Sequence, residues 1–166
     1  ALFGARDQGF DGFVDQPQAG QVVAVPHRAD AVVADHRLAA ADPQAAAQAQ
    51  RGDVVVAGAN FGIGSSREQA ASVLVYLGVV AVIAPSYSGL YFRNAFNVGL
   101  LLLTCEQASL IGDGETIHFD ARAGAITCAN GVTLRCQPIP GFLLDMVEAG
   151  GLLPQLKQRL KEERSS

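Results

Sequence analysis

The residues best suited to chemistry lie in one glycine-rich turn, NFGIGSSRE, which spans residues 60–68 and is called the serine turn below. Two adjacent hydroxyls, Ser65 and Ser66, are followed at once by Arg67. Gly62 and Gly64 would let another molecule approach the backbone closely. Helix N-termini and arginine side chains both favour carboxylates. The turn therefore predicts a small anion site, with a hydroxyl placed to act on the carbon next to a bound carboxylate.

A helix cap is the structural explanation of the same pattern. Ser65 and Glu68 have the spacing of a capping box, with Ser65 at the N-cap and Glu68 at the third helical position. Two adjacent hydroxyls are more than a cap requires, however. Arg67 would also fall in the first helical turn, where the helix dipole disfavours a cation. These features favour an anion site in addition to the cap.

The turn alone cannot turn Ser65 into a base at neutral pH. A hydroxyl starts near the pKa of water, about 15.7. A helix dipole contributes at most about 2 kcal/mol, or about 1.5 pKa units, and Arg67 adds a few more. A stronger electrophile must act on the substrate at the same moment, yet His27, His36 and His118 are not spaced as a metal site. The sequence therefore predicts no metal ligands in this chain and a half-site that another molecule completes.

Apolar runs and helical patterns around the serine turn predict a parallel α/β layer. Three runs read as buried strands: residues 54–57, 79–84 and 100–104. Two helices are expected between them. The first spans residues 67–77 and is closed by Gly78, and the second starts at Pro85-Ser86 and is terminated by Gly99. Strand, helix, strand, helix and strand in succession are typical of a parallel sheet.

The pattern changes on both sides of this layer. Short strands are predicted at residues 116–120, 126–128 and 132–136, with an Asn-Gly hairpin signal at 130–131. Two helices follow, at residues 142–149 and 152–163. In the N-terminal part, short strands are predicted at 21–25 and 31–33, and a helical stretch begins at 42–43.

Length and composition predict one globular domain. The chain has 166 residues, of which 49% are hydrophobic and 17% charged, and this is enough to bury a core. A net charge of -4 without a basic block makes nucleic acid an unsuitable partner. No apolar run approaches the roughly 18 residues of a membrane span, and no signal peptide is expected. Three cysteines without CxxC spacing, Cys105, Cys128 and Cys136, predict buried reduced thiols in a cytoplasmic protein.

The serine turn also resembles a known family. Residues 60–70, NFGIGSSREQA, are similar to the serine motif of the aconitase superfamily, and the best match is to the separate small subunits of 3-isopropylmalate dehydratase and homoaconitase. The resemblance extends over roughly residues 43–160. The further segments that match the family are residues 52–58, 81–84, 91–100, 113–114 and 142–153.

The resemblance implies an α/β fold of the aconitase-type swivelling domain, a three-layer β/β/α sandwich or barrel-like structure, over residues 1–166. Residues 1–43 are the divergent N-terminal part, and residues 150–166 carry the C-terminal helix. It also implies a large-subunit partner that carries a [4Fe-4S] cluster, with no cofactor on this chain. By position, Ser65 would be the catalytic base, and Ser66 and Arg67 would hold a substrate carboxylate.

The same resemblance implies a hydro-lyase acting on a hydroxy di- or tricarboxylic acid, with 3-isopropylmalate of leucine biosynthesis the leading substrate. Gln69 stands where many isopropylmalate enzymes have histidine, so a homoaconitase-like small subunit of the lysine pathway is an alternative. The family's N-terminal aspartate motif and its substrate-selecting loop are not intact here. Asp11 has the better distance from Phe3-Gly4 for the substrate-binding aspartate, and Asp30 competes with the better local apolar pattern. A non-catalytic binding module that keeps the fold is the third alternative.

Overall fold

A parallel sheet forms the centre of the molecule. The computed structural model describes residues 28–32, 51–64 and 67–165. In it, β2 (Val54–Val56), β3 (Ala81–Ala84) and β4 (Leu101–Thr104) pair in parallel in the order β2-β3-β4. Almost every residue of these strands is buried, as expected for continuous apolar runs covered on both faces. The predicted parallel α/β layer is thereby confirmed.

Two helices connect these strands. α2 (Gln69–Leu77) ends as predicted at Gly78, whose left-handed backbone directs its N–H to the carbonyls of Leu74 and Val75. α3 (Gly89–Asn97) begins later than the predicted Pro85-Ser86 start, which was wrong. Ser88 is its N-cap and accepts a hydrogen bond from the Tyr91 N–H.

A second sheet is antiparallel. It contains β1 (Arg28–Val32), β5 (Thr116–Asp120), β6 (Ala125–Thr127) and β7 (Thr133–Arg135), paired in the order β1-β5-β6-β7. Burial alternates along β5 to β7, because only one face of this sheet meets the core. The predicted Asn-Gly hairpin is present: the Val132 N–H donates to Asn130 Oδ1 at 2.9 Å, and Gly131 has a φ of 83°.

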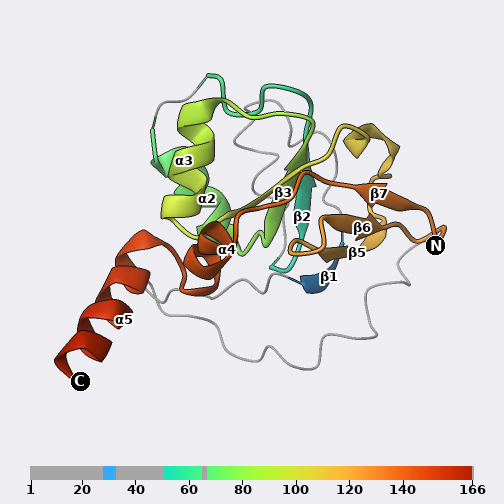
Figure 1. Ribbon diagram of the computed structural model, residues 1–166. Coiled ribbons are helices and arrows are strands. Elements are labelled where there is room, and N and C mark those ends of the chain that lie inside the picture. Colours follow the sequence, from blue (N-terminus) through green and yellow to red (C-terminus); the bar gives the residue numbers. More distant parts are fainter. Residues whose placement is uncertain (1–27, 33–50, 65–66, 166) are drawn as a thin grey trace.

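The described elements form three layers. Figure 1 shows α2 and α3 on one side of the parallel sheet and the antiparallel sheet on the other, which agrees with the predicted β/β/α sandwich. Side chains from both sheets join a single apolar core, including Ile83 and Leu102 from the parallel sheet and Phe119 and Ile126 from the antiparallel one. Within the described ranges, neither sheet closes on itself, so the barrel-like alternative is not observed.

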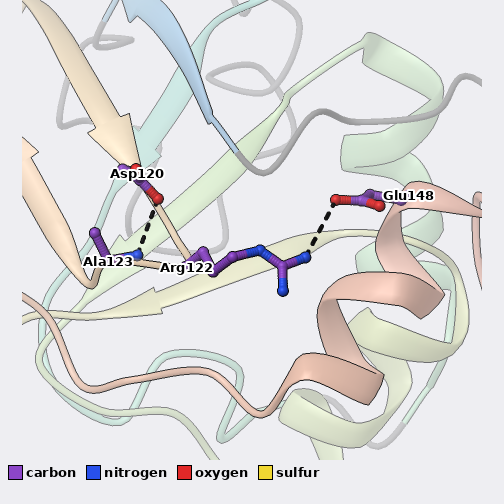
Figure 2. A network of polar contacts seen from close by, with 4 residues as sticks. All are labelled: Asp120, Arg122, Ala123 and Glu148. Atoms are coloured by element: carbon purple, nitrogen blue, oxygen red, sulfur yellow. Dashed lines mark hydrogen bonds and ion pairs between the residues drawn. The ribbon is translucent and has the colours of Figure 1, made fainter.

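A short 3-10 turn, η2 (Ala108–Leu110), connects β4 to β5. After β7, the C-terminal part packs onto this sandwich through α4 (Gly141–Glu148). Figure 2 shows Arg122, in the β5–β6 turn, directed toward Glu148 at the end of α4, with Nη2 and Oε1 3.9 Å apart. The same turn is closed by the Ala123 N–H, which donates to Asp120 Oδ1 at 2.9 Å. Both members of the ion pair are exposed, so it contributes about 0–1 kcal/mol.

α5 (Leu152–Arg164) is the most peripheral helix. It has no buried residue, and in Figure 1 it extends away from the layers. None of the helices in the described ranges is long and apolar enough to cross a membrane. The predicted strand at 21–25 and the helical stretch from 42–43 lie outside the described residues. The predicted strand at 31–33 overlaps β1.

Candidate functional site

The chain leaves the parallel sheet at the end of β2, and the start of the serine turn then pairs once more with the segment that follows β3. The Ala57 N–H donates to the Ile83 carbonyl at 2.8 Å, which continues the β2–β3 ladder by one step. The segments that follow β2 and β3 then separate and pair again at a parallel bridge between Phe61 and Tyr87. At this bridge, the Phe61 N–H donates to the Ser86 carbonyl at 3.0 Å, and the Ser88 N–H donates to the Phe61 carbonyl at 2.9 Å. The β3–α3 loop (residues 85–88) therefore supports the start of the serine turn.

Two serine hydroxyls of the β3–α3 loop also bind the turn. Ser86 Oγ accepts from the Asn60 N–H at 2.8 Å and donates to Asn60 Oδ1 at 3.4 Å. Ser88 Oγ donates to the Gly62 carbonyl at 3.2 Å while it caps α3. Asn60 itself has a φ of 59°, a left-handed conformation that asparagine tolerates better than most residues.

Gly62 allows the turn to lie directly on an aromatic cluster. Its φ is 82°, and a Cβ at this position would come within 2.3 Å of Cγ in the Tyr91 ring. The Phe61 ring packs edge-on against Tyr91, with centroids 5.1 Å apart, and against Tyr87, at 6.4 Å. Tyr91 belongs to the core and is only 2% exposed. Phe92 is partly buried against the same core.

Tyr87 joins the cluster to the sheet below it. Its hydroxyl lies between β3 and β4, 2.7 Å from the Val82 carbonyl and 3.0 Å from the Leu103 carbonyl, so its single proton is shared between these two acceptors. Burial raises the pKa of Tyr87 well above its usual value, so the hydroxyl remains a neutral donor. The turn is thus attached to a rigid part of the core.

The predicted chemical residues are only partly described. Ser65 and Ser66 lie outside the described residues. Arg67 is exposed and stands two positions before α2, next to the supported part of the turn. The proton-accepting role of Ser65 and the carboxylate-binding roles of Ser66 and Arg67 remain predictions.

The two candidate aspartates are separated by the described boundaries. Asp11 lies outside the described residues, whereas the backbone of Asp30 belongs to β1 and pairs with that of His118 in β5. In Figure 1, β1 lies toward the bottom of the view, and the serine turn leaves β2 at the top. The choice between the aspartates stays a prediction.

The start of α2 differs from the predicted capping box. Glu68, and not Ser65, occupies the N-cap position, and its side chain makes no capping hydrogen bond. The first N–H groups are instead satisfied through the backbone, because Ala70 donates to the Arg67 carbonyl and Ala71 to the Glu68 carbonyl. The helix therefore begins later than predicted.

The three cysteines each directly follow a strand of one of the two sheets, and Cys105 is close enough to interact with both others. Cys105, Cys128 and Cys136 follow β4, β6 and β7, and all three are free and buried, as predicted. Burial, and then the neighbouring Cys105 thiol, raise the pKa of Cys136 to about 12. Among the described residues, no three His, Cys, Asp or Glu side chains are arranged to hold a metal ion.

A model of the aconitase C-terminal domain matches residues 13–108, which include the serine turn and both helices beside it. This chain belongs to that family. The 3-isopropylmalate dehydratase small subunit of Sulfurimonas denitrificans is 39% identical over 130 residues, covering 78% of each chain. The isopropylmalate/citramalate isomerase small subunit of Methanocaldococcus jannaschii is 38% identical over 129 residues, covering 76% of this chain and 77% of the relative.

A solved relative supports the assignment of the fold. The crystal structure of 3-isopropylmalate dehydratase from Methanocaldococcus jannaschii matches with a TM-score of 0.66 and 38% identity, over 72% of each chain. The aconitase-type fold expected from the serine motif is therefore confirmed. Of the two candidate aspartates, Asp30 falls inside the matched family domain, and Asp11 lies two positions before it.

Sequence reasoning missed the residues that support the turn. Ser86 was interpreted as part of a helix start, and neither Asn60 nor Ser88 was given a role. The sequence did contain a signal, because both Ser86 and Ser88 stand just before the helical pattern of α3. One helix needs only one N-cap residue. The spare serine is then free to bind a neighbouring segment.

Proposed function

We propose that this chain is the small subunit of a 3-isopropylmalate dehydratase, a hydro-lyase that interconverts 3- and 2-isopropylmalate in leucine biosynthesis. The observation that carries the proposal is the serine turn itself, NFGIGSSRE, in a chain 39% identical to a protein of that name. The chain acts as one swivelling domain over residues 1–166. It works in the cytoplasm with a large subunit that carries a [4Fe-4S] cluster.

In this mechanism the chain supplies the base and the grip on the substrate. Arg67 and Ser66 bind one substrate carboxylate, the guanidinium through two parallel hydrogen bonds. Ser65 then removes the proton from the carbon next to that carboxylate. The cluster on the partner supplies a Lewis acid for departure of the substrate hydroxyl.

The chemistry of Ser65 requires that the partner cover the serine turn. Ser65 removes a proton only as its alkoxide, and the charge interactions that stabilise the alkoxide are strong only where water is excluded, because exposed charge interactions are screened. The large subunit must therefore cover the turn during the reaction. The substrate-binding aspartate is Asp11 or Asp30.

A Ser65→Ala substitution tests the proposed base. Loss of a general base costs about 100- to 10,000-fold in rate, so turnover by the reconstituted two-subunit enzyme should fall by at least about 100-fold. Melting should stay close to that of the unmodified chain, since Glu68 occupies the N-cap position of α2. Ser72→Ala is the matched control, because Ser72 Oγ donates to the Glu68 carbonyl at the start of the same helix. Activity of Ser65→Ala within tenfold of wild type would exclude the serine as the base.

Citramalate is a second candidate substrate, because the Methanocaldococcus jannaschii relative is named for both acids. The homoaconitase-like alternative adds homocitrate. The enzyme should be assayed with 3-isopropylmalate, citramalate and homocitrate under the same conditions, with formation of the unsaturated acid followed by its ultraviolet absorbance. The highest kcat/KM identifies the substrate. If none of the three acids is turned over, the result favours the remaining alternative, a non-catalytic binding module that keeps the fold.

The isolated chain tests where the cluster is held. Anaerobic reconstitution of the small subunit alone with iron and sulfide should give neither cluster absorbance nor turnover. Addition of the large subunit should produce both. A stoichiometric cluster on the isolated chain would contradict the two-subunit proposal.

A further inference from the structure

The β2–β3 pairing contains one extra residue on the side of the serine turn. Val56 is paired with Ile83, and the next pair is Phe61 with Tyr87. Between these two pairs, the chain advances five residues from Val56 to Phe61 but only four from Ile83 to Tyr87. An extra residue bends the strand that carries it and redirects the chain beyond it, and such irregularities are frequent next to active sites. Asn60, with a φ of 59°, lies within this longer segment immediately before the bridge.

The side chain of Ser86 hydrogen-bonds to Asn60 at this irregularity. Its single hydroxyl satisfies both the backbone N–H of Asn60, at 2.8 Å, and the side-chain Oδ1 of the same residue, at 3.4 Å. A hydroxyl has one donor and two acceptor positions, so it is suited to this double contact. Ser88 Oγ donates to the carbonyl of Gly62, the residue after Phe61, but that serine is also needed to cap α3. Ser86 has no cap to provide, because α3 begins at Gly89.

We propose that Ser86 is a positioning residue for Ser65: its double hydrogen bond to Asn60 fixes the left-handed residue from which the serine turn takes its direction. This inference rests on the proposed function, because it assigns Ser86 a role in proton removal by Ser65. A misplacement of about 1 Å can cost about 100-fold in rate. The two Ser86–Asn60 contacts are exposed, so water can replace them and the fold survives their loss.

The variants Ser86→Ala and Ser86→Thr test the proposal in the reconstituted two-subunit enzyme. Ser86→Ala should lower kcat by about 10- to 100-fold, with KM changed less than about threefold and with melting close to wild type. Ser86→Thr keeps the hydroxyl and should restore most of kcat. Ser72→Ala again serves as the control, because it removes a hydroxyl–carbonyl bond of α2 without detaching the turn.

Amide hydrogen exchange on the isolated small subunit provides a readout that does not depend on activity. Ser86→Ala should accelerate exchange at residues 60–64 and leave that of β3 and β4 unchanged. Unchanged exchange at residues 60–64 would overturn the proposal, whether or not the wild-type enzyme is active. Faster exchange with kcat within twofold of an active wild type would overturn it as well. An inactive wild-type enzyme, by contrast, would contradict the proposed function.

Discussion

Replacement of Gly62 by alanine is the most direct test of how the serine turn is held. The new Cβ would lie 2.3, 2.5 and 2.6 Å from Cγ, Cβ and Cδ2 of Tyr91, which is far inside van der Waals contact. Because Tyr91 is only 2% exposed, its ring cannot move aside without disturbing the core. Overpacking of this kind costs about 1–3 kcal/mol, and a φ of 82° adds about 1–2 kcal/mol for a residue with a Cβ.

The expected total is about 2–5 kcal/mol, a large share of the roughly 5–15 kcal/mol that stabilises a typical domain. Urea unfolding gives this difference, and the melting temperature should fall by about 5–15 °C. Gly58→Ala is the control, because a Cβ added there would have no atom within 4 Å and its φ is not in the left-handed region. That variant should be neutral or stabilised by up to about 1 kcal/mol. A Gly62→Ala variant within about 1 kcal/mol of wild type, a threshold near the size of an ordinary surface effect, would refute the proposed packing.

Three other predictions concern single side chains. Arg67→Lys keeps the charge but loses the two-point contact with a carboxylate, so KM should rise by about tenfold or more in steady-state assays; an unchanged KM would show that Arg67 does not touch the substrate. The Tyr91 hydroxyl is buried and has no hydrogen-bond partner among the described residues. Tyr91→Phe should therefore leave the free energy of unfolding unchanged or raise it by up to about 1–3 kcal/mol in urea, and a clear loss would reveal a partner for the hydroxyl. Cys136 has its pKa raised from 9.0 to about 12, so its contribution to stability is complete below pH 9.0 and is lost as the pH rises toward 12. Unfolding free energies measured from about pH 8 upward should fall less steeply in Cys136→Ala than in wild type, by up to about 1.4 kcal/mol per pH unit, and equal slopes would contradict the assignment.

Much of the fold could be predicted because burial leaves a clear pattern in the sequence. The strands of the parallel sheet are covered on both faces, so each reads as an uninterrupted apolar run such as residues 101–103. β5 exposes one face, so His118 alternates with the buried Ile117 and Phe119. These local patterns do not show which distant strands pair. The antiparallel contact of β1 with β5 joins segments far apart in the chain, and only the structure reveals it.

The details of the candidate site depended on contacts that the sequence does not display. Ser86 and Ser88 are equally good N-cap residues, and the choice between them is decided by Asn60 and Phe61, which bind the first of the two. The capping box failed for a similar reason, because the backbone itself satisfies the first N–H groups of α2. The SSR sequence, by contrast, could be singled out directly, since the side chains of the predicted anion site are adjacent in the chain.

The burial of every thiol in this chain gives the protein an internal reporter of its own opening. Cys105, Cys128 and Cys136 follow strands from both sheets, and none is exposed in the folded state. Alkylating reagents can therefore reach them only when the core opens. The rate of modification of each cysteine, read separately by mass spectrometry, would show whether the two sheets separate together or one before the other. The same measurement on the assembled enzyme would reveal how far partner binding slows that opening, without any label introduced into the chain.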